Sequence, residues 1–580
     1  MDLFEQARSR GVETSFVDGF GSAHTVDPET LRAVLKALPV APSDIERGVA
    51  PAVAQAFAGD FDQVWLLAVQ LYAVRSKHNW GIGDFSDLAE LIGWAGQVGA
   101  AGIGLNPLHA LYDDHTEDCS PYSPSSRLFL NPLYIDVTKV PGFSGEYITA
   151  HDDDLDVVRR SELVDYPRVA ELKRAALHKA YEAFRSHQDT EHWAGFHAFR
   201  KRRPLIARFA CFEHLRRKFG KPWWEWPDGF DRPDDAALNK LRYGTESATI
   251  EYYEFVQWCA DEQLRACAMR AKQLGLSIGL YLDVAVGVKA DGFDAWNEQQ
   301  AISRTLAVGA PPDLLNTAGQ NWGLAGFSAT GLALTRFVPF RDMLHAAMEY
   351  AGAIRIDHVL GLNRLYLIPE GNSADRGVYV RMPFDELLAV TASESIENRC
   401  VVVGEDLGTV PQDFREKLAK CGIWSYRVMM FERDEKAFHP VDRYPENSLV
   451  TFNTHDLPTF SSWKSGADLA LKLSLGLDPG ETREAREQGI GLLRRVLDGA
   501  DDDETIFPVL SLLARAKSRI LVISIDDLLG VIGQPNIPGT VNAHPNWRHR
   551  LPCEIRGLDT RIDVARLKTT LGSRLVQPSF

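Results

Sequence analysis

Three acidic residues stand where apolar, strand-like runs end: Asp357, Glu405 and Asp456. A buried parallel strand reads as a continuous apolar run, and in barrel folds the reactive side chains gather at the C-terminal ends of the strands. Three carboxylates delivered in this way predict one shared cleft. Paired carboxylates are the basic groups of glycoside chemistry.

A glycosyl transfer of the retaining type first requires a nucleophile. A retaining glycosyl transfer needs a carboxylate on one face of the sugar and a protonated carboxylic acid on the other, about 5–5.5 Å away. Asp357 is the candidate nucleophile. Arg355 stands two residues earlier, and alternate residues of a strand share a face. We therefore expect Arg355 to lie beside Asp357 and to lower the pKa of its carboxyl.

The second requirement is a carboxyl group that carries a proton. Glu405 is the candidate acid and base, and we expect the adjacent Asp406 to keep it protonated, because like charges disfavour joint ionisation. Asp456 follows His455, and its oxygens could hydrogen-bond sugar hydroxyls. Bonds of that kind can strengthen in the transition state.

A structural interpretation of the same residues stands beside the catalytic one. An acidic residue at a strand end is commonly a helix cap or a loop residue, and Arg355 and Asp357 could form a structural ion pair. His358 and His455 could be hydrogen-bonded structural groups. Spacing alone leaves both interpretations open.

The elements that would position these residues alternate between apolar runs and helical segments, the pattern of a β/α fold. Eight runs are strand candidates, the number that a (β/α)8 TIM barrel needs. They are Val64–Val74, Gly102–Pro107, Ser277–Val288, Ala353–Asp357, Cys400–Glu405, Tyr426–Phe431, Leu449–Asn453 and Ile520–Ile525. The pattern does not separate a closed barrel from an open sheet.

Several stretches fall outside the alternation. Residues 1–60 are predicted to form a short N-terminal helical element, and residues 61–580 the catalytic barrel. Within the barrel, residues from about 135 to 275 are charged, helical in pattern and rich in Trp, which predicts an inserted helical subdomain. A second insertion, about 291–340, contains a polar loop punctuated by Gly and Pro at 309–327, which we expect to act as a lid.

Composition narrows the class of protein. The chain has 580 residues and a net charge of −16, which disfavours a polyanionic partner such as nucleic acid. The seven cysteines include no CxxC pair, so neither a disulfide framework nor a cysteine zinc site is indicated. No long apolar stretch and no signal-like N-terminus are evident, so we expect no membrane partner and a cytoplasmic location.

Several motifs together resemble one family, the 4-alpha-glucanotransferases (amylomaltase, disproportionating enzyme; glycoside hydrolase family 77). Arg355–Gly361 resembles its nucleophile motif, Gly404–Gly408 its acid/base motif and Thr454–Asp456 its third-carboxylate motif. The other matching segments are Ser120–Pro124, Asn131–Leu133, Pro311–Asp313, Gly319–Gly323, Asn536–Thr540 and Asn546–Arg548. The order of these motifs favours this family over amylases, which share the carboxylate trio.

The resemblance implies a retaining transfer without cofactor or metal. Asp357 would attack the anomeric carbon of an α-1,4-glucan, Glu405 would protonate the leaving oxygen, and Asp456 would stabilise the transition state. The acceptor would be the 4-OH of glucose or of another α-1,4-glucan. Two alternatives remain: an α-glucan hydrolase on the same scaffold, and an inactive glucan-binding protein. The oligomeric state is left open.

The resemblance also implies which side chains bind the sugars. Tyr122 and Trp322 are candidate stacking platforms, because both lie in polar loops and sugar rings have apolar faces. Asp283 falls where the family places an Asp that contacts substrate or Arg. The remaining candidates for substrate binding are Arg355, His358, His455, Asp313 and Gln320. The segment Asn79–Asp84, also a family signature, is interpreted first as structure and second as a sugar contact.

Overall fold

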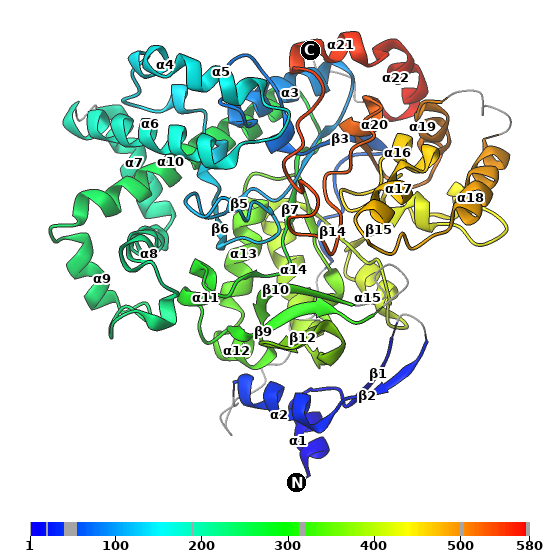
Figure 1. Cartoon of the computed structure of the whole chain (residues 1–580), viewed down its shortest axis with the longest axis horizontal. Coiled ribbons are helices and arrows are strands. Elements are labelled where there is room, and N and C mark those ends of the chain that lie inside the picture. The colour runs from blue at the N-terminus through cyan, green and yellow to red at the C-terminus, as the bar shows by residue number, and fades with distance from the viewer. Residues whose placement is uncertain are drawn as a thin grey trace.

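The computed structural model describes residues 2–18, 21–39, 55–187, 190–312, 319–497 and 504–575. Its centre is a closed barrel of eight parallel strands (Figure 1), which confirms the predicted (β/α)8 architecture. In order around the barrel the strands are β11 (Ala353–Ile356), β14 (Val401–Gly404), β15 (Trp424–Val428), β16 (Ser448–Thr451), β17 (Ile520–Ser524), β3 (Val64–Val69), β4 (Gly102–Leu105) and β7 (Gly279–Val284). Each lies within one of the predicted apolar runs or overlaps it.

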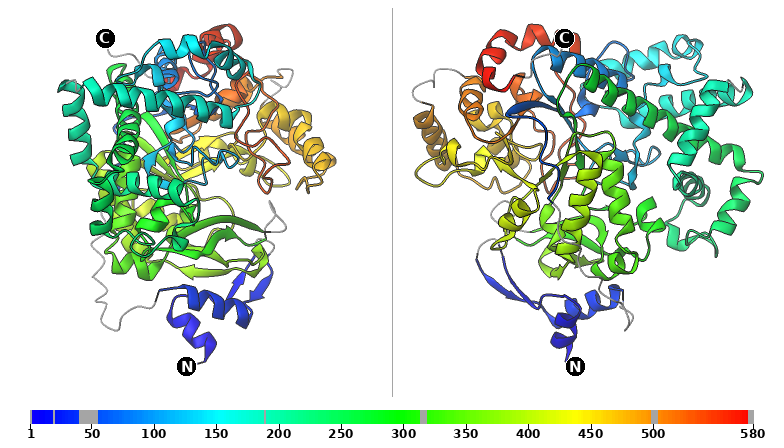
Figure 2. Two further views of the ribbon diagram at one scale, coloured as in Figure 1. Left: turned by 60° about the vertical axis from the view of Figure 1, so that its left-hand side comes forward. Right: turned by 180° about the vertical axis from the view of Figure 1, so that it is seen from behind.

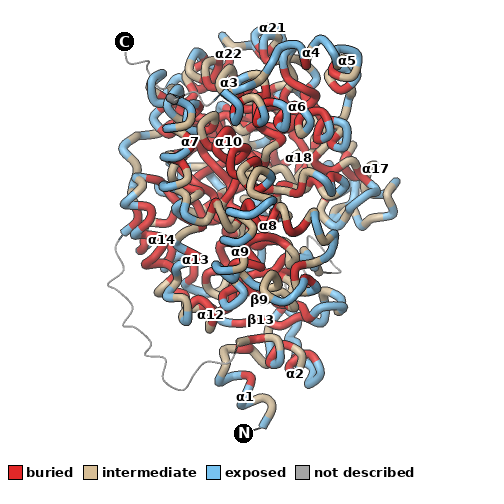
Figure 3. The backbone as a smooth tube through the Cα atoms, turned by 90° about the vertical axis from the view of Figure 1, so that its left-hand side faces the viewer, coloured by how far each residue is buried: buried red, intermediate tan, exposed pale blue. Residues whose placement is uncertain are grey.

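The apolar runs are explained by burial on both faces of the sheet. On β14, Val401 and Val403 pack in one cluster with Leu66 of β3, whereas Val402 packs in the larger cluster that includes the surrounding helices. Alternate residues of a strand point to opposite faces, so both faces need apolar side chains. The buried residues accordingly run through the middle of the molecule (Figure 3).

Helices surround the barrel and pack against its outer face. Those that follow or precede barrel strands include α3 (Phe85–Gln97), α13 (Val338–Met348), α14 (Phe384–Asn398), α15 (Phe414–Lys420), α19 (Phe507–Ala514) and α20 (Ile525–Leu528). The C-terminal part adds α16 (Phe460–Ser465), α17 (Ala467–Ser474), α18 (Arg483–Val496), α21 (Leu558–Arg561) and α22 (Val564–Thr570). No helix among the described residues is long and apolar enough to cross a membrane.

In the sequence, a group of helices separates β6 (Ser126–Leu130) from β7. These helices lie on the left in Figure 1. They are α4 (Glu146–Ala150), α5 (Asp152–Arg160), α6 (Tyr166–His187), α7 (Thr190–Arg202), α8 (Ile206–Phe219), α9 (Asp235–Arg242) and α10 (Ser247–Gln273). The long helix α10 contacts both α3 of the barrel and α8 of this group, and so joins the two. The boundaries at about 135 and 275 stay a prediction.

The segment predicted as a polar lid loop is largely a β-hairpin. Strands β9 (Ile302–Ala310) and β10 (Gln320–Phe327) pair antiparallel within a five-stranded sheet that also holds β8 (Val288–Lys289), β12 (Arg364–Pro369) and β13 (Val378–Arg381). A side chain at Gly309 would place its Cβ 2.1 Å from the Gln320 carbonyl oxygen. Glycine is therefore needed at 309 for close strand approach, and not as a hinge.

The N-terminal part lies against this sheet, at the bottom of Figures 1 and 2. It contains α1 (Leu3–Ser9), β1 (Ser15–Val17), β2 (Ala23–Thr25) and α2 (Pro28–Ala37), so two short strands accompany the expected helices. Val12 forms an isolated antiparallel bridge with Val380 of β13. The Glu13 carboxylate pairs with Arg364 at 3.1 Å and with Arg381 at 3.3 Å. Residues 40–54, which lead to the barrel, are outside the described residues.

Candidate active site

The ends of two neighbouring strands bring Asp357 and Glu405 to the same edge of the barrel. Strand β11 lies between β7 and β14, and Ile356 is in register with both Val284 and Gly404. The Asp357 N–H donates to the Val284 carbonyl at 3.1 Å, and the Glu405 N–H donates to the Ile356 carbonyl at 3.0 Å. The backbone therefore fixes both residues immediately beyond the strand ends.

One buried guanidinium joins two of the carboxylates at this edge of the barrel. Arg355 Nη1 donates to both oxygens of Asp283, at 2.9 and 2.8 Å, and Nη2 lies 2.9 Å from Asp357 Oδ1. The pairing follows from register, because Arg355 of β11 stands opposite Asp283 of β7. A planar guanidinium held at both ends in this way fixes the position of the Asp357 carboxylate.

The pKa of Asp357 moves against the sequence-based expectation. Burial raises it to about 6, although Arg355 acts in the opposite direction. The negative charges of Asp283 and Glu405 add to the effect of burial. Arg355 does lower the pKa of Asp357, as expected, but burial has the larger effect and the net pKa is raised. Arg355 also pairs with Asp283, so its charge does not serve Asp357 alone.

Glu405 is almost fully buried, and both of its carboxylate oxygens accept backbone hydrogen bonds. The donors are the N–H groups of His358 at 3.0 Å and Leu407 at 2.7 Å. Burial raises the pKa of Glu405, while Arg355 and these two N–H groups oppose the rise. A carboxyl with a raised pKa is suited to exchange a proton with a leaving oxygen.

Asp406 contributes less to that shift than the sequence suggested. Its carboxylate accepts a hydrogen bond from Arg415 Nε at 2.6 Å and another from the Tyr426 N–H at 3.1 Å. A charge already paired with a cation repels its neighbour weakly. Burial, and not Asp406, is the main reason why the pKa of Glu405 is raised.

Asp456 is held by the segment that follows the last barrel strand. Asn536 Nδ2 donates to Asp456 Oδ1 at 2.6 Å, and Gln534 Nε2 donates to the Asp456 carbonyl at 2.9 Å. His455 Nε2 lies 3.3 Å from Asp456 Oδ2. Burial alone would raise the pKa of Asp456, but His455 and Asn536 outweigh it and lower the pKa. This carboxylate is therefore kept ionised.

An aromatic stack connects Asp456 with the Arg355 pair. The Tyr122 ring stacks on His455, with centroids 4.7 Å apart, and lies 5.4 Å from the Trp547 ring. The Tyr122 hydroxyl donates to Asp283 Oδ2 at 2.5 Å. Tyr122 is thus anchored at both its face and its hydroxyl, by groups that come from three other parts of the chain.

The hairpin reaches the same site through Trp322. The Trp322 ring meets the His358 ring edge-on, with centroids 5.2 Å apart, and His358 directly follows Asp357. Trp322 Nε1 donates to the Gln320 side-chain oxygen at 3.1 Å, so Gln320 positions the indole. Asp313, another candidate for substrate binding, lies outside the described residues.

The sequence pattern of the family described as 4-alpha-glucanotransferase, glycoside hydrolase family 77, matches residues 69–555. The chain belongs to this family.

Relatives support the same assignment. The 4-alpha-glucanotransferase of Haemophilus influenzae is 35% identical over 541 residues, covering 84% of this chain and 75% of that protein. The 4-alpha-glucanotransferase of Mycobacterium tuberculosis is 35% identical over 521 residues, covering 84% and 71%.

Solved structures agree on the fold. An amylomaltase from Corynebacterium glutamicum superposes with a TM-score of 0.84 at 25% identity, covering 98% of this chain and 99% of that one. An amylomaltase from Streptococcus agalactiae in complex with acarbose gives a TM-score of 0.73 at 21% identity, covering 89% and 100%, which is a likeness of fold.

Three residues that contact the site of this glucanotransferase were given no role by the sequence. Asn536 and Trp547 were noted only as parts of matching segments, and Arg415 was not noted. The first two follow the last barrel strand in a polar, Gly- and Pro-rich stretch, and that position is a usable signal. Arg415 lies on α15 and carries no comparable signal.

The early segment Asn79–Asp84 proves to be structural. Trp80 is buried and stacks on Tyr147, with centroids 5.7 Å apart and planes 4° apart. Asp84 caps helix α3 by accepting hydrogen bonds from backbone N–H groups. The first of the two interpretations of this segment therefore fits, since a buried indole offers no face to a sugar.

Proposed function

We propose that Asp357, Glu405 and Asp456 carry out a retaining transfer of α-1,4-glucan segments, the reaction of the family to which the chain belongs. The observation that supports it best is the Arg355 bridge, which fixes Asp357 at a strand end next to the one that bears Glu405. The predicted separation of these two carboxyl groups, about 5–5.5 Å, stays a prediction.

The first step forms a bond between enzyme and sugar. Ionised Asp357 attacks the anomeric carbon, and the C–O bond to the leaving glucan breaks as Glu405 gives its proton to that oxygen. The oxygen that carries the proton can donate it to the glycosidic oxygen and keep the hydrogen bond from its backbone N–H group, because a protonated carboxyl retains acceptor capacity. Asp456 accepts hydrogen bonds from sugar hydroxyls as positive charge develops on the ring.

The second step returns the sugar to an acceptor. Glu405, now ionised, takes the proton of an acceptor 4-OH, whose oxygen displaces Asp357 from the anomeric carbon with net retention. The acceptor is glucose or another α-1,4-glucan. Trp322 on the hairpin offers a face against which an acceptor ring can pack, and a closed hairpin would keep water from the glycosyl-enzyme.

The chemistry of the two steps needs no metal or cofactor. The described cleft residues supply an ionised nucleophile, a protonatable Glu405 and a fixed Asp456. We further infer a cytoplasmic location, which the seven free cysteines, six of them buried, support because reduced thiols are usual there.

Incubation with maltotriose alone tests the proposal. Longer maltooligosaccharides together with glucose would be the products of transfer. Glucose and maltose alone would mean that water is the acceptor and that the chain is a hydrolase. No turnover of maltotriose or of longer glucans with added glucose would leave the glucan-binding alternative. Glu405→Gln is the matched inactive control, because the amide keeps the shape but has no acidic proton.

A further inference from the structure

Trp547, which contacts the aromatic stack of the site, adopts a backbone conformation that a bulky residue rarely takes. Its φ of 61° lies in the left-handed region. Trp547 lies between α20 and the next helical turn, η10 (Ile555–Gly557). Strained backbone of this kind is kept where the surrounding structure imposes it, often at functional sites. The other described non-glycine residues with positive φ all lie at or beside helix ends: Arg336, Phe337, His358, Arg399 and Asp413.

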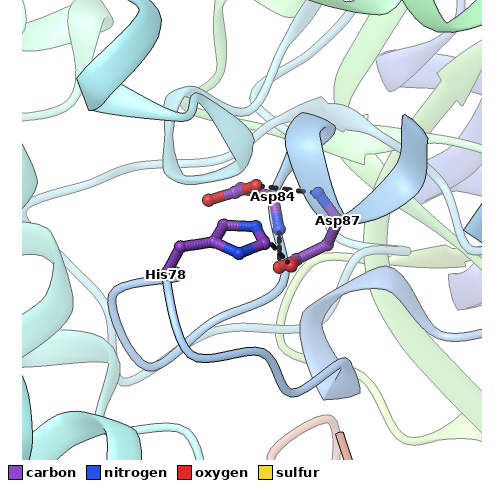
Figure 4. Close-up of side chains that lie close together, drawn as sticks. All are labelled: His78, Asp84 and Asp87. Carbon is purple, nitrogen blue, oxygen red and sulfur yellow. Dashed lines mark hydrogen bonds and ion pairs between the residues drawn. The ribbon is translucent and has the colours of Figure 1, made fainter. Parts of the chain in front are cut away.

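Local contacts explain the polar cluster at the start of α3. Asp84 and Asp87 form a capping box there, and His78 Nε2 lies 3.1 Å from Asp87 Oδ1 (Figure 4). This cluster therefore serves the start of its own helix. The contacts of Trp547 instead join segments that are far apart in the sequence and lead to Asp456.

The side chain of Trp547 supports the residue next to Asp456. Its ring centroid lies 5.4 Å from that of His455, with the planes tilted by 50°, and 5.4 Å from that of Tyr122. Tyr122 is also fixed by its hydroxyl bond to Asp283, whereas His455 is held by Tyr122, Trp547 and its contact with Asp456. Only 6% of Trp547 is exposed, so the indole supports these rings and offers no open face to a sugar.

The backbone of Trp547 closes the loop that carries the hydrogen-bond donors of Asp456. The Trp547 N–H donates to the Pro535 carbonyl at 2.9 Å. Gln534 and Asn536, on either side of Pro535, are the residues whose side chains donate to Asp456. The bond from Trp547 therefore fixes the chain between these two donors.

Tyr166, the first residue of α6, holds the other side of Trp547. Its hydroxyl donates to the Trp547 carbonyl at 2.7 Å. Burial raises the pKa of Tyr166 well above its usual range, so the hydroxyl keeps its proton. The adjoining chain is anchored as well, since the Val164 N–H donates to the Arg548 carbonyl at 2.8 Å. Both peptide groups that flank Trp547 are thus held, and this maintains the left-handed conformation.

We propose that Trp547 is a positioning residue for the transfer. It holds Asp456 by two routes, through the His455 ring and through the segment Gln534–Asn536. The Tyr166 hydroxyl keeps Trp547 in the conformation that both routes need, which gives the helical insertion a part in the reaction. The inference rests on the proposed function, since Asp456 stabilises the transition state of that reaction.

Rates of maltotriose consumption by the full-length protein test the proposal, together with the Tm of each variant. Trp547→Ala should lower kcat by about 10–100-fold, because a misplacement of about 1 Å can cost that much. KM should change little, because the bonds of Asp456 to the sugar strengthen in the transition state. Trp547→Phe keeps a ring beside His455 and should restore most of kcat.

Tyr166→Phe removes only the hydroxyl that holds the Trp547 carbonyl, and should lower kcat by about 3–10-fold with little change in KM. Tyr147→Phe is the matched control, because the buried Tyr147 hydroxyl donates to another backbone carbonyl of the helical insertion, that of Leu172, at 3.0 Å. Both variants lose one buried hydrogen bond of the same type and should show similar decreases in Tm. Only Tyr166→Phe should lose activity.

The proposal is overturned if Trp547→Ala keeps the kcat of the parent protein, if it changes KM alone, or if Tyr147→Phe loses as much activity as Tyr166→Phe. Should Trp547→Ala fail to fold, the comparison of the two Tyr variants decides. Maltotriose is consumed by transfer and by hydrolysis alike, so a parent protein that only hydrolyses would refute the proposed function and still test this inference. A parent protein that consumes no glucan would overturn both.

Discussion

The charge of Asp283 should set the pH at which transfer begins. Asp357 must be ionised to attack, and burial raises the pKa of its carboxyl to about 6 in the substrate-free cleft. The ratio kcat/KM reports the ionisations of the free enzyme. We therefore expect kcat/KM to be high above pH 6 and to fall tenfold per pH unit as the pH drops below it, because protonated Asp357 is not a nucleophile.

The perturbation is Asp283→Asn, which removes a negative charge from the other end of the Arg355 guanidinium. Both carboxylates contact this one group, at 2.8 Å for Asp283 and 2.9 Å for Asp357. For charges about 6 Å apart, Coulomb's law at an effective dielectric constant of about 20–40 gives about 1.4–2.8 kcal/mol, or roughly 1–2 pH units. The acid limb of the pH profile, where kcat/KM falls as the pH drops, should therefore move from about pH 6 to about pH 4–5.

The assay uses an α-maltosyl fluoride donor, whose leaving group depends little on protonation by Glu405, so the acid limb reports Asp357. Tyr122→Phe is the control: it removes the hydroxyl that donates to Asp283 and keeps the carboxylate charge. Its limb should stay close to that of the parent protein. A limb that stays at pH 6 in Asp283→Asn, or that moves to higher pH, would refute the assignment of the limb to Asp357.

Three further substitutions test single contacts. Asp357→Asn should lower kcat by about 10⁴-fold or more, since an amide cannot form the glycosyl ester, and ready turnover of maltotriose would remove Asp357 as nucleophile. Trp322→Ala should raise the ratio of hydrolysis to transfer and the KM for glucose as acceptor, and unchanged product ratios would speak against the hairpin as a lid. Asn536→Ala removes a charge-assisted hydrogen bond to Asp456 and should lower kcat/KM by about 10–100-fold, corresponding to about 1.5–3 kcal/mol, whereas an unchanged value would mean that Asp456 needs no such support.

The barrel was predictable because its strands are buried on both faces. Every residue of Val401–Gly404 and of Ala353–Ile356 is buried, and this requirement leaves apolar runs in the sequence, interrupted in the second only by Arg355. The polar residues that end such runs were therefore easy to place at one edge. No single apolar run shows that the sheet closes into a barrel, because closure depends on the pairing of β7 with both β4 and β11.

The hairpin was missed because its pattern is interrupted. Register shifts fall between Asn321 and Leu324, and again between Ala325 and Gly326, so β10 lacks a regular two-residue alternation. Its partner β9 is also paired with β12, more than fifty residues later. Such a strand pairs with a distant segment and contains glycines that allow close approach. Its local sequence therefore has the pattern of a loop.

The pKa of Glu405 is raised, as the sequence suggested, but the causes of the pKa shifts at both carboxyls were not visible in the sequence, which shows neighbours along the chain and not burial or partners across the barrel. Asp406 adjoins Glu405, yet Arg415 of α15 neutralises it from nine residues away. Arg355 adjoins Asp357, yet Asp283 shares its charge. Once these partners are counted, burial is the largest influence on both reactive carboxyls. The proton on Glu405 is then set by how far the cleft excludes water, so a hairpin that closes over the substrate would strengthen the acid as well as protect the intermediate.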